Sequence, residues 1–147
     1  MNNIWNNLWI WIPILTWFLV QCLKVIFELI KNKKLNIRRM IGSGGMPSSH
    51  SALVCSLATS IGLTEGLASP MFAISFALAA IVMYDASGVR RAAGKQAKIL
   101  NQIIESEGKN INVQAKLIEL LGHTPLEVYV GATIGILMAI ILVPLWK

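Results

Sequence analysis

The chain contains two histidines, and each lies at the start of a long apolar segment. The first ends the sequence Gly42-Ser-Gly-Gly-Met-Pro-Ser-Ser-His50. Glycines let the backbone approach a ligand closely, and Ser48 or Ser49 is a natural N-cap for a following helix. Such a helix start binds anions through its unpaired N–H groups, and His50 in the first turn can act as acid or base near neutral pH. The alternative is a flexible loop that ends in an ordinary cap.

The second histidine precedes the last apolar segment, in Gly122-His-Thr-Pro-Leu-Glu127. Thr124 can be the N-cap, Pro125 the first helical residue and Glu127 the third, which is the pattern of a capping box. His123 and Glu127 are also four residues apart, so the carboxylate can fix the tautomer of the imidazole and raise its basicity. Both interpretations of Glu127 remain open on the sequence.

The third apolar segment ends in Tyr84-Asp-Ala-Ser-Gly-Val-Arg-Arg91. The guanidinium groups of Arg90 and Arg91 can hold phosphate oxygens in bidentate geometry, or they can anchor a helix at a membrane surface. Asp85 is an ionisable residue near the end of an apolar segment, which makes it a functional candidate. The interpretation we favour for it is a pair with Arg90, Arg91 or Lys95.

One more cation lies inside the first apolar segment. Lys24 is one helical turn before Glu28, and an ion pair at that spacing is the simple interpretation. Its place in an apolar segment keeps it a candidate phosphate ligand.

The elements that carry these residues are apolar. The chain is 55% hydrophobic and only 14% charged, whereas soluble domains are about 25% charged. This composition argues against an ordinary soluble enzyme and against a disordered chain. Four apolar segments approach the length of about 20 residues that a membrane-spanning helix needs. The second and third are short enough to be buried helices instead. We therefore predict one all-α domain (1–147), an integral-membrane bundle of about four transmembrane helices, with spans 9–30, 46–63, 70–86 and 128–146.

Basic residues are distributed unevenly between these segments. Five lie in 31–45 and six in 87–122, and the opposite side has only Lys147. The positive-inside rule then predicts that both basic segments are cytoplasmic and both termini are outside. The second and fourth spans both begin on the cytoplasmic side, so the two histidines face one compartment. Because the charges follow membrane loops, the net charge of +6 does not favour nucleic acid as a partner.

The cytoplasmic region 87–122 has a pattern of its own. Its apolar residues recur at helical spacing and basic residues lie between them, which predicts an amphipathic helix on an anionic membrane surface. The sequence after Glu105 interrupts this helix, and a second short helix is expected over about 113–121. The apolar residues of the first helix are Val89, Ala93, Ala97, Leu100, Ile103 and Ile104.

Three blocks of the sequence together resemble one family. They are Ser43-Gly-Gly-Met-Pro-Ser-Ser-His-Ser51, Met83-Tyr-Asp-Ala-Ser-Gly-Val-Arg-Arg91 and Leu120-Leu-Gly-His-Thr-Pro-Leu-Glu-Val128. The chain resembles the type 2 phosphatidic acid phosphatase and vanadium haloperoxidase superfamily, which carries Lys-x6-Arg-Pro, Pro-Ser-Gly-His and Ser-Arg-x5-His-x3-Asp elements. The resemblance is closest to the small divergent bacterial and plastid branch, and it implies a bacterial cell membrane.

The resemblance implies roles for individual residues. His123 would attack phosphorus to form a phosphohistidine, Glu127 would orient His123, and His50 would protonate the leaving oxygen. The implied chemistry requires no metal and no cofactor. Side chains or backbone that would hold the phosphate are those of Ser48, Ser49, Arg90, Arg91, Lys24, Lys31, Arg38 and Gly45, with Asp85 as support.

The chain departs from the family pattern at several positions. Ser49 replaces the usual glycine, and Lys31-x6-Arg38 has the spacing of the first element but lacks its proline. Between Arg91 and His123 lie 31 residues where the family has five, which leaves open which arginine reaches the phosphate. The six-helix fold is reduced to four helices, whose exposed faces a homodimer would cover.

The expected function is a membrane lipid phosphate phosphatase. Its substrate would be phosphatidic acid, phosphatidylglycerophosphate or a polyprenyl diphosphate, at an active site facing the cytoplasm. The alternative is a non-catalytic membrane protein that binds or transports phospholipid headgroups. A soluble haloperoxidase does not fit so apolar a chain.

Overall fold

The computed structural model describes residues 4–33, 45–106, 117 and 122–146, and within them the regular structure is entirely helical. A short 3₁₀ turn, η1 (Ile4–Asn6), precedes the first long helix. The predicted all-α class is therefore confirmed. The five long helices are α1 (Leu8–Asn32), α2 (Ser49–Glu65), α3 (Pro70–Ser87), α4 (Val89–Ser106) and α5 (Pro125–Leu145).

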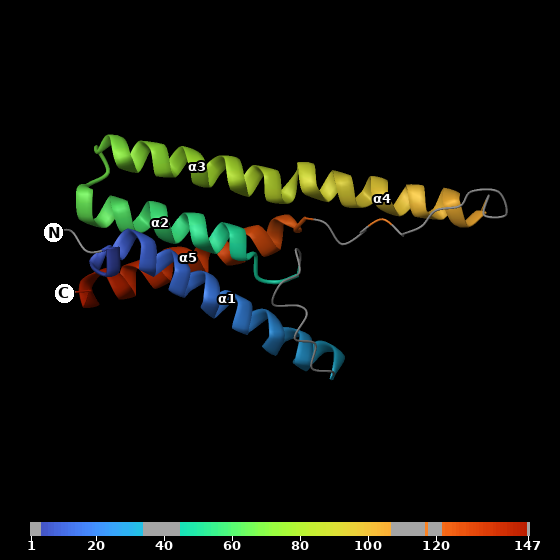
Figure 1. Ribbon diagram of the computed structural model, residues 1–147, viewed down its shortest axis with the longest axis horizontal. Coiled ribbons are helices and arrows are strands. Elements are labelled where there is room, and N and C mark those ends of the chain that lie inside the picture. The colour runs from blue at the N-terminus through green and yellow to red at the C-terminus, as the bar shows by residue number, and fades with distance from the viewer. Residues whose placement is uncertain (1–3, 34–44, 107–116, 118–121, 147) are drawn as a thin grey trace.

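Four of the helices form an antiparallel bundle (Figure 1). The chain termini and the turn between α2 and α3 lie at one end of this bundle. The end of α1, the end of α3 and the starts of α2 and α5 lie at the other. The chain order therefore brings His50 and His123, which lie at two helix starts, to the same end of the molecule.

Side-chain caps set where the helices begin. Ser48 accepts a hydrogen bond from the Ser51 N–H at the start of α2, and Ser69 accepts one from the Phe72 N–H at the start of α3. The capping box predicted from the sequence is present at the start of α5. Because these caps are local, the helices of the bundle begin within three residues of the predicted spans.

Among the residues that the structure describes, three helical ranges are long and apolar enough to cross a membrane, judged by length and composition. They are Leu8–Ile30, the joined range Pro70–Ser106, and Pro125–Leu145. The predicted span 46–63 corresponds to α2, which has only 17 residues and a length of about 26 Å against a hydrocarbon core of about 30 Å. Membrane crossing by α2 stays a prediction.

Helix α2 occupies the centre of the bundle and contacts α1, α3 and α5. Its small and hydroxyl side chains are buried there, and the hydroxyls bond within their own helix: Ser56 donates to the Leu53 carbonyl and Ser60 to the Ser56 carbonyl. A polar side chain that is satisfied within the helix can be buried in an apolar bundle. The moderate hydropathy of α2 thus follows from its position among other helices rather than against lipid.

Two glycines let α5 approach α2 closely. A Cβ atom on Gly131 would collide with the carbonyl oxygen of Ser48, and one on Gly135 would collide with that of Ala52. Glycines four residues apart on an apolar helix form a flat surface that brings two backbones together. The start of α5 is therefore fixed directly against the start of α2.

Helix α4 confirms the amphipathic helix predicted after Ser87, and its docking on a membrane surface stays a prediction. It continues nearly in line with α3, away from the bundle (Figure 1), and Gly88 is the only residue between the two helices. The joined range of 37 residues would be about 55 Å long, well beyond the thickness of a bilayer core. A helix that continues α3 in this way extends from the end of the bundle instead of lying across it.

The chain returns along α4 at one described point. The Asn101 side chain accepts from the Leu117 N–H at 3.0 Å and donates to the Leu117 carbonyl at 2.9 Å. The second short helix predicted over 113–121 lies outside the described residues apart from Leu117.

Candidate active site at two adjoining helix starts

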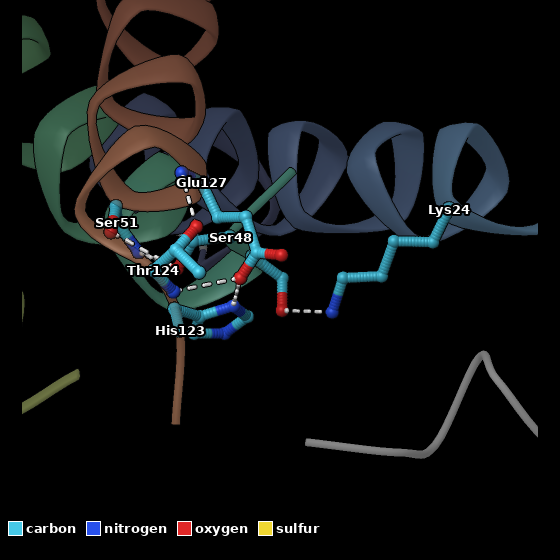
Figure 2. Close-up of polar contacts among 7 residues, drawn as sticks. Lys24, Ser48, Ser51, His123, Thr124 and Glu127 are labelled. Carbon is cyan, nitrogen blue, oxygen red and sulfur yellow. Dashed lines mark hydrogen bonds and ion pairs between the residues drawn. The ribbon is translucent and has the colours of Figure 1, made fainter. Parts of the chain in front are cut away.

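The starts of α2 and α5 are joined by a backbone hydrogen bond. The Ser48 N–H donates to the Glu127 carbonyl at 3.0 Å. On the other side of Ser48, its hydroxyl oxygen accepts from the Ser51 hydroxyl at 3.0 Å (Figure 2). Two helix N-termini thereby lie side by side, and their dipoles both favour negative charge at this end of the bundle.

Glu127 combines the two interpretations that the sequence left open. Its Oε2 atom accepts from the Thr124 N–H at 2.9 Å and lies 3.2 Å from Nδ1 of His123 (Figure 2). A carboxylate beside Nδ1 favours the tautomer that carries its proton there. The other ring nitrogen, Nε2, then has a lone pair available for attack.

The two histidine rings lie against each other. Their centroids are 5.9 Å apart and the rings meet edge to face. Nδ1 of His50 and Nε2 of His123 are both buried and have no hydrogen-bond partner among the described residues. Buried polar atoms are normally paired, so these two nitrogens identify a place where a polar ligand is expected.

The long region between Arg91 and His123 does not separate these residues in space. The His123 N–H donates to the Ala86 carbonyl at 2.9 Å, which fixes the histidine to the end of α3. Gly122 has φ +85° and packs so closely that a Cβ atom would collide with the backbone N of Arg91. The chain leaves the bundle along α4 and comes back to the point where it left.

Arg90 is the arginine whose charge acts on His50. Its Nε donates to Oδ2 of Asp85 at 2.7 Å, and both side chains are partly exposed. Asp85 thus pairs with one of the cations that the sequence suggested, and Arg91 is exposed on α4.

Lys24 is the lysine that the structure brings to the site. Its side chain is only 5% exposed, and Nζ donates to the Ser49 hydroxyl at 3.2 Å (Figure 2). Its charge acts on both histidines. The rival Lys31 is seven residues further along α1, about 10 Å away along the helix axis, and its side chain is outside the described residues, as is Arg38.

Burial governs the protonation of His123, which is 2% exposed. It lowers the pKa of this imidazole below the ordinary 6.5, and the hydrogen bond with Glu127 opposes that change. The backbone of Gly45, with φ +86°, also lies close enough to raise this pKa. His123 is therefore neutral at pH 7, as a nucleophile must be.

The sequence interpretation missed three residues that build this site. Gly131 could have been found from the Gly-x3-Gly spacing in the last apolar segment. Gly122 and the Ala86 carbonyl have no comparable signal, because their contacts join residues far apart in the chain.

Comparisons with known proteins relate the chain to a family and to a bacterial membrane protein. A family model described as the divergent PAP2 family matches residues 5–138. The chain is similar to the uncharacterized membrane protein YuiD of Bacillus subtilis (strain 168), at 42% identity over 134 residues. That alignment covers 83% of this chain and 85% of the Bacillus protein. No solved structure gives a significant match.

Proposed function

Because this chain belongs to the divergent PAP2 family and has helices suited to a membrane, we propose that it is a membrane lipid phosphate phosphatase. Its substrate would be a phosphomonoester or diphosphate of a lipid, of the phosphatidic acid, phosphatidylglycerophosphate or polyprenyl diphosphate type. The active site would face the cytoplasm, on the side of the two basic segments.

One observation carries the proposal. Nδ1 of His123 is held by the Glu127 carboxylate, while Nε2 is buried without a partner among the described residues and adjoins a second histidine. A nucleophile that is oriented by a third group and lies near a proton donor is the arrangement of covalent catalysis.

The first chemical step would transfer the phosphoryl group to the protein. Nε2 of His123 attacks phosphorus, the bond from phosphorus to the lipid oxygen breaks, and His50 gives a proton to that oxygen. Lys24, Arg90 and the two helix starts surround the place where charge develops, and electrostatic stabilisation of this kind is a large part of catalysis. Ser48 and Ser49 lie at the same helix start.

The second step would release phosphate. Water attacks phosphorus, the bond from phosphorus to Nε2 breaks, and the water gives its proton to His50. Both histidines then return to their initial states.

Phosphate release from a panel of lipid phosphates tests the proposal. The purified full-length protein in detergent would be given phosphatidic acid, phosphatidylglycerophosphate and a polyprenyl diphosphate, and His123→Ala would be measured beside it. We expect release from at least one of them by the wild type and none above background by the variant. If the wild type binds these lipids but releases no phosphate, the non-catalytic binding protein replaces the phosphatase.

A further inference from the structure

A groove between α3 and α5 begins beside the histidine end of the bundle. Its mouth is a cavity of about 170 Å³ lined by Met83, Tyr84, Ser87, Pro125, Val128 and Tyr129. Ser87 follows the residue whose carbonyl binds the His123 N–H, and Pro125 is two residues after that histidine. The mouth is therefore continuous with the backbone that holds the candidate nucleophile.

Next to the mouth lies a larger apolar cavity of about 460 Å³. Met83 lines both cavities. Residues of α2, α3 and α5 form the walls of the larger cavity, and Thr59 is the one hydroxyl among them. The α3 wall runs from Phe72 to Met83, about 16 Å along the helix and close to half of a bilayer core of about 30 Å.

The residues near the histidines are charged, whereas those of the larger cavity are apolar. The mouth is flanked by Tyr84 and Tyr129, which are 75% and 66% exposed, and tyrosine is enriched at membrane–water interfaces. The charges of Lys24 and Arg90 act on His50, whose ring lies against that of His123. His123 is two residues before Pro125 of the mouth, and the apolar cavity shares Met83 with the mouth. The cations match the anionic head of an amphiphile, the tyrosines match the membrane interface, and the apolar walls match one hydrocarbon chain.

We propose that this α3–α5 groove binds one hydrocarbon chain of the lipid whose phosphate lies at His123. The inference rests on the proposed function for the identity of the headgroup. It adds that the chain is held by the protein between α2, α3 and α5, so the groove contributes to affinity and distinguishes lipid phosphates from soluble ones.

Photocrosslinking tests where the chain lies without requiring turnover. Full-length protein carrying His123→Ala would be placed in phosphatidylcholine vesicles that contain phosphatidic acid with a diazirine in one acyl chain. We expect crosslinks on α2 and α3 between Cys55 and Met83. If phosphatidylcholine with the same diazirine chain labels these residues equally, the groove is only a lipid-facing surface and the proposal is overturned.

A filling substitution and a matched control test the affinity. Ala80→Phe places a ring in the cavity from an exposed position of α3, whereas Ala77→Phe adds the same ring at an exposed position outside the lining. We expect Ala80→Phe to reduce labelling by phosphatidic acid about tenfold, since loss of burial of about two methylene groups has that effect on binding. We expect Ala77→Phe to leave it unchanged, and equal effects of the two variants would contradict the proposal.

Turnover then separates this inference from the proposed function. With an otherwise wild-type chain, Ala80→Phe should raise KM for long-chain phosphatidic acid and leave hydrolysis of nitrophenyl phosphate unchanged. A wild type that hydrolyses neither substrate would remove the phosphatase but not the groove, provided that phosphatidic acid still labels it preferentially. Equal losses on both substrates would overturn the groove and leave the phosphatase.

Discussion

At the scale of single residues, the two histidines have different surroundings and should have different roles. His123 is held by Glu127 through Nδ1, whereas Nδ1 of His50 has no hydrogen-bond partner among the described residues. The first arrangement suits a nucleophile, and the second leaves a ring free to exchange a proton with a ligand.

We therefore expect different responses to the two alanine substitutions. His123→Ala removes the attacking atom and should abolish release from every phosphate ester. His50→Ala removes only proton donation, which typically contributes about 10²–10⁴-fold. A nitrophenyl phosphate has a good leaving group, so it should restore much of the activity of His50→Ala and none of that of His123→Ala.

Trapping the intermediate provides an independent check of this assignment. Phosphohistidine is labile in acid, so a phosphate bound to His123 should be lost at low pH and retained in base. Near-normal turnover by His123→Ala on any lipid phosphate would refute the assigned mechanism.

Glu127→Gln should separate helix capping from catalysis. Glutamine also serves in a capping box, so the thermal unfolding midpoint should change little. The charge that holds the His123 tautomer is lost, and we expect activity to fall by up to about 10⁴-fold, as for the carboxylate that orients the histidine of a serine-protease triad. Comparable losses of stability and activity would show that Glu127 acts only as a cap.

The same variant should move the acid limb of the pH profile of kcat/KM in one definite direction. His123 attacks only in its neutral form, and burial holds its pKa below 6.5 in the wild type. The acid limb of kcat/KM should therefore lie below pH 6.5. Because Glu127 raises this pKa, the residual activity of Glu127→Gln should have its acid limb at still lower pH, and a limb that moves upward would contradict the assignment.

At the scale of elements, the close contact of α2 and α5 sets the geometry of the site. Gly131→Ala adds a Cβ atom that must move the Ser48 carbonyl. Alanine is about 1 kcal/mol more favourable than glycine in a helix, whereas overpacking costs about 1–3 kcal/mol. We expect a net loss of stability, seen as a lower unfolding midpoint in detergent, together with lower activity.

A control on the exposed face of α5 makes this test specific. Thr133→Ala changes an exposed side chain whose hydroxyl bonds only within its own helix. We expect little change in midpoint or activity from it. A higher midpoint for Gly131→Ala would show that the helices are not in close contact at this position.

Sequence patterns were sufficient for these elements wherever their cause is local. The capping box at Thr124 and the serine cap before His50 mark helix starts because the contacts lie within one turn. The direction of α4 was not predictable from its amphipathic pattern. A periodic apolar face shows that a helix has two sides, but it does not show how that helix continues from α3 beyond Gly88.

At the scale of the whole molecule, the positions of the two chain ends are consistent with the predicted orientation, in which both termini lie outside. Both termini lie at the end of the bundle opposite the histidines (Figure 1). We expect a cysteine added after Lys147 to react with an impermeant reagent in intact cells. A cysteine at position 109 should react only after permeabilisation, in a chain whose Cys22 and Cys55 are replaced by alanine. Labelling of position 109 from outside would reverse the orientation and the side of the active site.

The assembled site also marks the limit of sequence interpretation. The spacing of His123 and Glu127 predicts their contact because four residues make one helical turn. The contact of His123 with Ala86 joins residues that lie before and after α4 in the chain, so it depends on tertiary packing. For the same reason Lys24 and Lys31 could not be distinguished until α1 was placed beside α2.

Oε2 of Glu127 contacts two groups, and this affects how the protein responds to heat. Oε2 both closes the first turn of α5 and orients His123, and helix ends open more readily than helix centres. Fraying of that single turn would release the imidazole while the rest of the bundle stays folded. Inactivation on warming should therefore precede loss of helix, so that activity reports the opening of one turn rather than the melting of the molecule.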